Sequence, residues 1–194
     1  DRQMNYPRGK TLGGSSSING LLYIRGQSQD YDYWRQLGNV GWSWDDVLPY
    51  FKKSENNQRG ENNFHGAAGP LSVENMRVKM KVLDTFINAA SEFGYKHQSD
   101  FNTGDNEGIG YFQVTQRNGF RCSAAVGYLN PIKNRKNLKI ITKAHIKNIE
   151  FIDKKAVSVN YWLGNELKSA QTNIEIILSA GSIGSPHILQ ASGI

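Results

Sequence analysis

The sequence contains a single cysteine, Cys122, among its 194 residues. One thiol cannot close a disulfide within the chain, and it cannot supply the clustered thiolates of a structural zinc site. We interpret Cys122, which stands between Arg121 and Ser123, as an inert buried thiol. Cysteine usage leaves the compartment unknown, and we expect a cytoplasmic or peripherally membrane-associated protein rather than a secreted one.

Long apolar runs are also missing from the chain. No stretch approaches the roughly 20 apolar residues of a membrane span, and no basic-then-apolar segment has the pattern of a secretion signal. The formal net charge of +6 could indicate a nucleic-acid partner. The basic residues are spread along the chain, however, with no aromatic RNA-binding strand or zinc-finger spacing among them. We therefore expect no membrane span and no nucleic acid.

Several catalytic motifs are absent. The dinucleotide-binding fingerprint is incomplete, because Gln113 follows Gly108 and Gly110 where a further glycine is required. The Gly-x-Ser-x-Gly elbow of serine hydrolases does not occur. The histidines lack both a helical i, i+4 pair and a nearby carboxylate cluster, so we predict no metal site. We interpret each of them as a surface or packing residue: His65, His97, His145 and His187.

Three helices are predicted before residue 95. One covers 29–37 and ends at Gly38, and another covers 82–93. The helix between them begins at Ser43, with Asp46 three residues later to complete a capping box. Because Pro49 lies inside that helix, we expect a kink or a break there.

Strands and loops occupy most of the remaining chain. The polar, glycine-punctuated segment 56–69 predicts an exposed loop, and Asn118-Gly119 predicts a tight turn. The last third has the pattern of a β-meander followed by a glycine-rich turn and a helix with Pro186 at its first position. Strands are predicted at 70–74, 111–116, 138–142, 146–152, 156–163, 166–171 and 174–179. The chain therefore belongs to the mixed α/β class.

Two glycine-rich junctions are candidates for ligand binding. They are Gly13-Gly14-Ser15-Ser16-Ser17 and Ala180-Gly181-Ser182-Ile183-Gly184. Glycine has no Cβ, so a flat ring or a phosphate can approach the backbone closely. A helix that follows such a turn also offers N–H groups to an anion. Taken alone, each junction fits a tight turn as well as a ligand loop.

The segment from Pro7 to Gly20, followed by Tyr23-Ile24-Arg25-Gly26, resembles the first signature of the glucose–methanol–choline (GMC) flavin oxidoreductases. The segment from Gly181 to Ile194 resembles the second signature. Between them, Arg121-Cys122-Ser123-Ala124-Ala125 is similar to the choline dehydrogenase and long-chain alcohol dehydrogenase branch. The likeness covers essentially the whole chain, and two long signatures at the family's spacing are highly specific.

This resemblance implies a fold and a set of FAD-binding residues. The fold would be part of a Rossmann-like FAD-binding domain with a β-meander, together with part of the substrate-binding domain. Residues 1–55 and 131–194 would belong to the FAD-binding part, and 56–130 to the substrate part. The residues implied to contact FAD are Gly13, Gly14, Ser15, Asn19, Gly20, Leu21, Leu22, Ile146, Ala180 and Gly181.

The resemblance also implies the reaction. The family oxidises an alcohol by passing hydride to flavin N5 while a histidine takes the hydroxyl proton, and that histidine is expected beyond Ile194. We therefore expect the chain to be an internal part of a longer enzyme, inactive alone, that acts on a choline-like or aliphatic primary alcohol. The electron acceptor would be oxygen or a quinone-type carrier. Ile18 occupies the position where some members carry a flavin-linked histidine, so FAD is expected to be held noncovalently.

A second hypothesis comes from another class of protein. A noncatalytic, β-rich module could use the aromatic residues between 31 and 51 and the basic faces to hold carbohydrate or nucleic acid. The helical spacing of those aromatic residues favours core packing instead.

Overall fold

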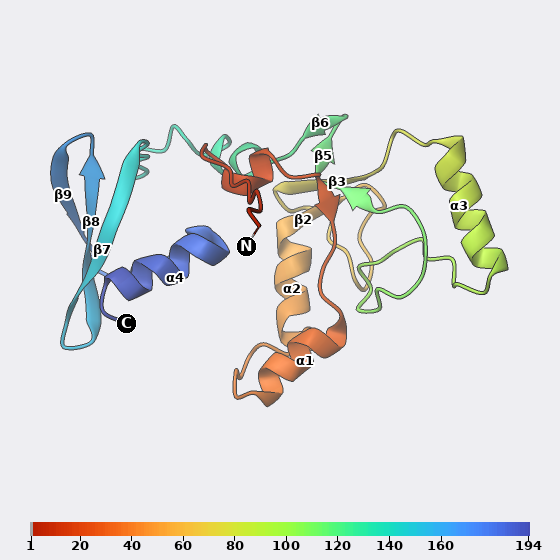
Figure 1. The fold of residues 1–194 in the computed structure, drawn as a ribbon, viewed down its shortest axis with the longest axis horizontal. Helices are drawn as coiled ribbons and strands as arrows, with labels where there is room; N and C mark the ends of the chain where they lie inside the picture. The colour runs from red at the N-terminus through yellow and green to blue at the C-terminus, as the bar shows by residue number, and fades with distance from the viewer. Residues whose placement is uncertain (1) are drawn as a thin grey trace. The chain divides into compact units, whose positions relative to one another are not determined.

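The computed structural model describes residues 2–194, which fold into two compact units. One unit extends to Arg135 and the other is Lys136–Ile194. Each combines strands with helices, which confirms the mixed α/β class (Figure 1). Within residues 2–194, no helix combines the length and the apolar character needed to cross a membrane.

The first unit is organised around a small mixed sheet with strand order β1-β4-β3-β2. Its inner strand β3 (Leu71–Asn75) pairs in parallel with β2 (Glu55–Asn57) and antiparallel with β4 (Gln113–Val114). The short strand β1 (Leu22–Tyr23) pairs with the other edge of β4. Val73 on β3 is fully buried, so the core of this unit lies at the sheet.

Helices α1 (Ser28–Gln36) and α2 (Trp44–Ser54) form the helical part beside this sheet. The predicted capping box is present, because the Ser43 hydroxyl accepts from the Asp46 amide and the Asp46 carboxylate accepts from Ser43. Aromatic rings fill the space between the helices, with the Tyr31 ring centre 5.7 Å from that of Phe51. Core packing of these aromatic residues is thereby confirmed for Tyr31 and Trp44, which are both buried.

The structure corrects two expectations for this unit. Helix α2 continues through Pro49 without the expected break, since the proline removes one N–H near the helix start, where the exposed Asp45 carbonyl can turn to water. The alternative expectation, a kink at Pro49, stays a prediction. Segment 56–69 is exposed at most of its positions, as predicted, but Asn57, His65 and Gly66 are buried and Asn57 belongs to β2. The expectation of a fully exposed loop is wrong at these three residues, where buried polar groups bond to one another inside the fold.

A hairpin and a third helix complete the first unit. Strands β5 (Gln116–Arg117) and β6 (Phe120–Arg121) pair across Asn118 and Gly119, which both have positive φ, so the predicted turn is confirmed. A short π-helical turn, η2 (Ala125–Leu129), follows β6.

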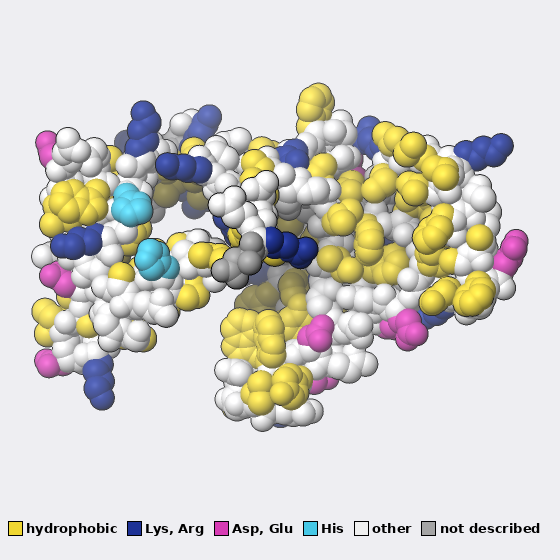
Figure 2. Space-filling model, viewed as in Figure 1, with side chains coloured by type: hydrophobic (Ala, Val, Ile, Leu, Met, Phe, Trp, Pro, Cys, Tyr) yellow, Lys and Arg dark blue, Asp and Glu magenta, His cyan; other side chains and the backbone are white. Residues whose placement is uncertain are grey.

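Helix α3 (Lys81–Glu92) ends before Gly94 as predicted. Phe86 on α3 and Phe93 just after it are both exposed. Figure 2 shows apolar side chains gathered over this helix.

The second unit is an antiparallel three-stranded sheet with one helix. Its strands are β7 (Ala144–Ile152), β8 (Lys155–Leu163) and β9 (Glu166–Gln171), and its helix is α4 (Gly181–Ala191). Helix α4 packs on β7, where the Ser192 hydroxyl just after the helix accepts a 2.8 Å hydrogen bond from the Ile149 amide.

Three expectations for the second unit are wrong. Segments 138–142 and 174–179 do not form strands, because no neighbouring strand among the described residues supplies the backbone partners that a strand requires. Helix α4 begins at Gly181 rather than at Pro186, which lies inside it. The glycine-rich segment is thus the first turn of the helix.

Candidate functional site

The loop from Gly13 to Leu22 holds most of the predicted site residues, and its backbone is unusual. Residues 14–17 form a single 3-10 turn, η1 (Gly14–Ser17), and φ is +89° at Gly13 and +53° at Gly14. Leu21 also has positive φ, at +69°, although it is not a glycine. Such a conformation is costly for a side-chain-bearing residue and persists only where surrounding contacts hold it.

The loop glycines have different surroundings. A Cβ at Gly13 would lie 2.5 Å from Ser17 Oγ and 3.2 Å from Ala125, so the fold itself requires glycine there. A Cβ at Gly14 or Gly20 would meet no atom of the described residues within 4 Å. Those two positions leave the backbone open to a ligand.

The loop serines mainly hold the loop to neighbouring segments. The Ser15 hydroxyl accepts a 3.2 Å hydrogen bond from the Gly9 amide. The Ser16 hydroxyl donates to the Gly13 carbonyl and accepts at 2.9 Å from the Ala124 amide, which joins the loop to the segment after β6. The Ser15 hydroxyl proton has no acceptor among residues 2–194, so it can be donated to a ligand.

The Asn19 side chain is held in place by two hydrogen bonds at its oxygen atom. Its Oδ1 accepts from the Leu21 amide at 3.1 Å and from the Arg121 guanidinium at 2.7 Å. Its Nδ2 makes no hydrogen bond within the described part of the chain, and the residue is exposed. The Asn19 side chain therefore offers amide donors outward.

The apolar residues of the loop are exposed rather than packed. Ile18 is 50% exposed and Leu22 is 51% exposed, so neither side chain belongs to the core. The backbone at Leu21 is fixed nonetheless, because its carbonyl accepts from the Thr115 amide at 2.8 Å and from the Thr115 hydroxyl at 3.2 Å. Exposed apolar side chains on a well-fixed backbone are typical of a surface that a ligand or another segment covers.

The second unit brings two of its three predicted residues together. Ile146 and Ala180 line one pocket of about 420 Å³ whose other walls include Ile149, Ile177 and Ile188. Gly181, with φ of +85°, is the first residue of α4. The N-cap residue Ala180 supplies no side-chain cap to the first N–H groups of that helix, and its own amide donates to the Ser185 hydroxyl at 2.9 Å.

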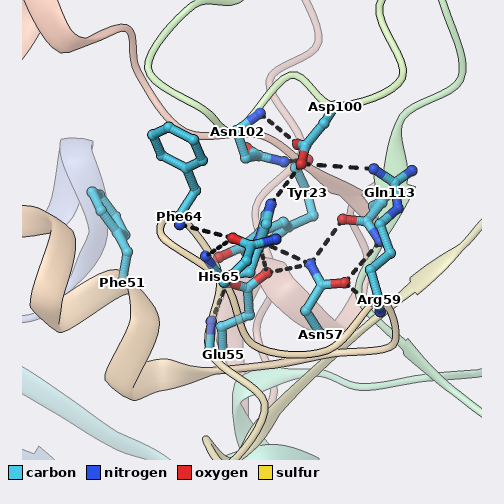
Figure 3. A network of polar contacts seen from close by, with 12 residues as sticks. Tyr23, Phe51, Glu55, Asn57, Arg59, Phe64, His65, Asp100, Asn102 and Gln113 are labelled. Carbon is cyan, nitrogen blue, oxygen red and sulfur yellow. Dashed lines mark hydrogen bonds and ion pairs between the residues drawn. The ribbon is translucent and has the colours of Figure 1, made fainter.

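A buried ionic cluster in the first unit was not predicted (Figure 3). His65 is fully buried, with Nδ1 2.9 Å from Glu55 Oε1 and Nε2 2.7 Å from Asp100 Oδ2. Arg25 forms a 2.5 Å ion pair with the other oxygen of the Glu55 carboxylate. The description of the histidines as remote from carboxylates is therefore wrong for His65. His65 is fully buried, which agrees with its interpretation as a packing residue.

The electrostatics of this cluster favour a charged imidazole. Burial by itself lowers the pKa of His65, but hydrogen bonds to Asp100 and Glu55 and their negative charges raise it to about 9. Burial by itself raises the pKa of Asp100, but the hydrogen bond with His65 and other contacts lower it below its ordinary value. The cluster joins the segment after β1, the end of α2, the 56–69 segment and the loop around Asp100 into one body. Its chemistry is structural, and no local pattern in the sequence indicated it, because its members come from separate segments of the chain.

Known proteins resemble this chain over its whole length. The family model described as GMC oxidoreductase matches residues 1–194. The chain is 42% identical over 197 residues to "Alcohol dehydrogenase [acceptor]" of Pseudomonas putida and 43% identical over 195 residues to "Oxygen-dependent choline dehydrogenase" of Vibrio vulnificus. Both alignments cover 100% of this chain but only 36% and 35% of the relatives, so the chain spans about a third of their length.

Solved structures show the same likeness. Pyridoxine 4-oxidase from Mesorbium loti matches with a TM-score of 0.90 and 29% identity over 96% of this chain and 37% of that chain. An FAD-dependent oxidoreductase from Chaetomium thermophilum matches with a TM-score of 0.89 and 31% identity over 96% of this chain and 35% of that one. The similarity to the choline and alcohol dehydrogenase branch is confirmed, since relatives of both names match over the whole chain. The chain belongs to the GMC oxidoreductase family.

Proposed function

We propose that the protein to which this chain belongs binds FAD and oxidises a primary alcohol to the aldehyde. The observation that supports this most is the Gly13–Leu22 loop, which combines open backbone at Gly14 and Gly20 with the outward amide donors of Asn19. A flat heterocycle with acceptor atoms fits such a surface, because glycine allows close approach and the amide donates to the ring edge. Two matching relatives are named as alcohol and choline dehydrogenases.

The residues of the chain fit FAD in two places. In the first unit, Ser15, Asn19 and Gly20 would bind polar edges of the flavin, while Leu22 would exclude water from it. In the second unit, Ile146 would contact the cofactor along the apolar pocket, and Ala180 and Gly181 would approach it at the uncapped start of α4. Residues 1–55 and 131–194 would thus form the FAD-binding part, with 56–130 contributing to the substrate part.

The chemistry is divided between the cofactor and the protein. Bound FAD supplies a hydride acceptor for the carbon that carries the hydroxyl group. This chain orients the cofactor and keeps water away, and the base that takes the hydroxyl proton is a histidine outside residues 1–194. The substrate is a choline-like or aliphatic primary alcohol, and oxygen or a quinone-type carrier removes the electrons.

FAD is held noncovalently in this proposal. Ile18 has no nucleophilic atom that could bond to the flavin, and its half-exposed side chain can pack against the ring. Retention of the cofactor would then depend on burial, hydrogen bonds and the contacts in the second unit.

Product analysis of the full-length protein tests the proposed reaction. Purified enzyme is incubated with choline or with a straight-chain primary alcohol, either in air or with a soluble quinone in the absence of oxygen. We expect the matching aldehyde from at least one alcohol with at least one acceptor. A flavin-loaded protein that forms no aldehyde from any primary alcohol would contradict the proposed function.

A further inference from the structure

We propose that Arg121 is a positioning residue that orients the Asn19 amide toward an acceptor atom of the bound flavin. The inference rests on the proposed FAD site and assigns a role to a residue that lies outside the loop itself. Arg121 is the last residue of β6, about a hundred residues along the chain from Asn19. The guanidinium nevertheless reaches across to the loop.

The guanidinium makes a forked set of contacts. Nη1 donates to the Ser16 carbonyl at 3.0 Å and to Asn19 Oδ1 at 2.7 Å, while Nη2 donates to the Asn19 carbonyl at 2.8 Å. A planar guanidinium has fixed donor directions, so these contacts together define where Asn19 lies. A lysine ammonium at the same place has one nitrogen and cannot span these acceptors in the same way.

These contacts also select the orientation of the Asn19 amide. Its oxygen accepts from both Arg121 and the Leu21 amide. A flipped amide would turn its NH₂ group toward these two donors and lose both hydrogen bonds. The observed orientation therefore leaves the Nδ2 donors facing outward, with no acceptor among residues 2–194. A ligand that satisfies them must present a hydrogen-bond acceptor.

The strand that carries Arg121 is itself joined to the loop. The Cys122 amide donates to the Thr115 carbonyl at 2.9 Å, and Thr115 in turn donates to the Leu21 carbonyl. On the far side of the loop, the Ala124 amide bonds to Ser16 Oγ. The hairpin therefore holds the loop on both sides of Asn19, and Arg121 supplies the contact to the side chain.

Arg121 also places a positive charge beside the loop. It forms no ion pair within the described residues, so only carbonyl and amide oxygens face its guanidinium. A positive charge near a flavin favours the reduced, more negative cofactor. Removal of this charge should lower the reduction potential of the flavin, an effect that a purely structural role would not produce.

The test compares variants of the full-length holoenzyme by FAD dissociation constant and flavin reduction potential. In Arg121→Met, we expect native circular dichroism, FAD binding weaker by about tenfold or more, and a lower potential. Arg121→Lys should lie between this variant and the wild type. The matched control is Arg117→Met on the same hairpin, because Arg117 donates to the Pro70 carbonyl and not to the loop. Its FAD binding and potential should match those of the wild type.

A double-mutant cycle tests whether Arg121 acts through Asn19. In an Asn19→Ala background, Arg121→Met should weaken FAD binding by less than about threefold, since the amide it orients is gone. Fully additive effects would overturn the proposal, and so would a folded Arg121→Met with wild-type FAD binding and potential. If Arg121→Met does not fold, the same cycle is run with Arg121→Lys, and wild-type behaviour of that variant overturns the proposal. A wild-type enzyme that contains no FAD would instead refute the proposed function.

Discussion

Gly13 and Gly20 differ in what surrounds the position that a side chain would occupy. A Cβ at Gly13 would crowd Ser17 and Ala125, whereas one at Gly20 would meet nothing within 4 Å in the described structure. We expect Gly13→Ala to lower the free energy of unfolding by about 1–2 kcal/mol, because the position also has positive φ. Gly20→Ala should leave stability unchanged and reduce FAD occupancy. Urea unfolding and flavin absorbance measure the two effects, and full FAD occupancy in Gly20→Ala would mean that the cofactor does not approach this residue.

His65 gives the fold a dependence on alkaline pH. Its pKa of about 9 lies above the ordinary value of 6.5, so folding favours the protonated form. The stabilisation is complete below pH 6.5 and is lost as the pH rises toward about 9. We expect the free energy of unfolding to fall across this range. Replacement by alanine should remove this dependence and cost about 3 kcal/mol, since Glu55 and Asp100 lose their buried partner.

The control for His65 is His97, which is exposed and forms no ion pair among the described residues. Unfolding curves of the wild type, His65→Ala and His97→Ala are compared at several pH values. His97→Ala should behave as the wild type. An alkaline loss of stability that persists unchanged in His65→Ala would show that another group causes it. Neither substitution should alter the rate of flavin reduction in a folded enzyme, because neither residue lies in the proposed FAD site.

Among the helices and strands, several local signals predicted the structure correctly, although those at Pro49 and Pro186 did not. The Ser43 and Asp46 capping box, the Asn118-Gly119 turn and the stop at Gly94 involve residues close in sequence, and the structure has all of them. Likewise, the glycine-rich loop could be located from its motif. The contacts of Arg121 with Asn19 and of His65 with Asp100 could not be predicted, because they join segments far apart in the chain.

Segment 174–179 shows why strand prediction failed in the second unit. The exposure of its side chains alternates along residues 176–179, as it does in a strand, and Ile177 on the outer side is 79% exposed. The segment therefore has the side-chain alternation of a strand, but a strand forms only where a neighbouring strand supplies hydrogen-bond partners. A single sequence contains the pattern of the strand and no information about its neighbour.

This segment provides a prediction about the full-length protein. The backbone N–H groups of residues 176–179 form no hydrogen bond within the described residues. We expect them to exchange rapidly with deuterium in the isolated chain and slowly in the full-length protein, where another strand pairs with them. Residues 158–163 of β8, which pair with β7 on one side and β9 on the other, serve as the reference. Equally fast exchange of 176–179 in both proteins would contradict this prediction.

For the whole molecule, the proposed noncovalent attachment of FAD rests on one residue. Ile18 cannot bond covalently to flavin, so acid denaturation of the holoenzyme should release the colour into the supernatant. Absorbance of the supernatant and of the redissolved pellet measures the two fractions. Colour that remains with the precipitated protein would show a covalent link made by another residue.

We propose above all that this chain contributes to an FAD site that accepts hydride from an alcohol carbon. Rapid mixing of the full-length holoenzyme with alcohol, in the absence of oxygen, tests this proposal most directly through the visible absorbance of oxidised flavin. We expect a primary alcohol to bleach this absorbance, deuterium on the carbinol carbon to slow the bleaching, and the aldehyde to appear in equal amount. Flavin that stays oxidised with every primary alcohol, or bleaching without aldehyde, would contradict the proposal.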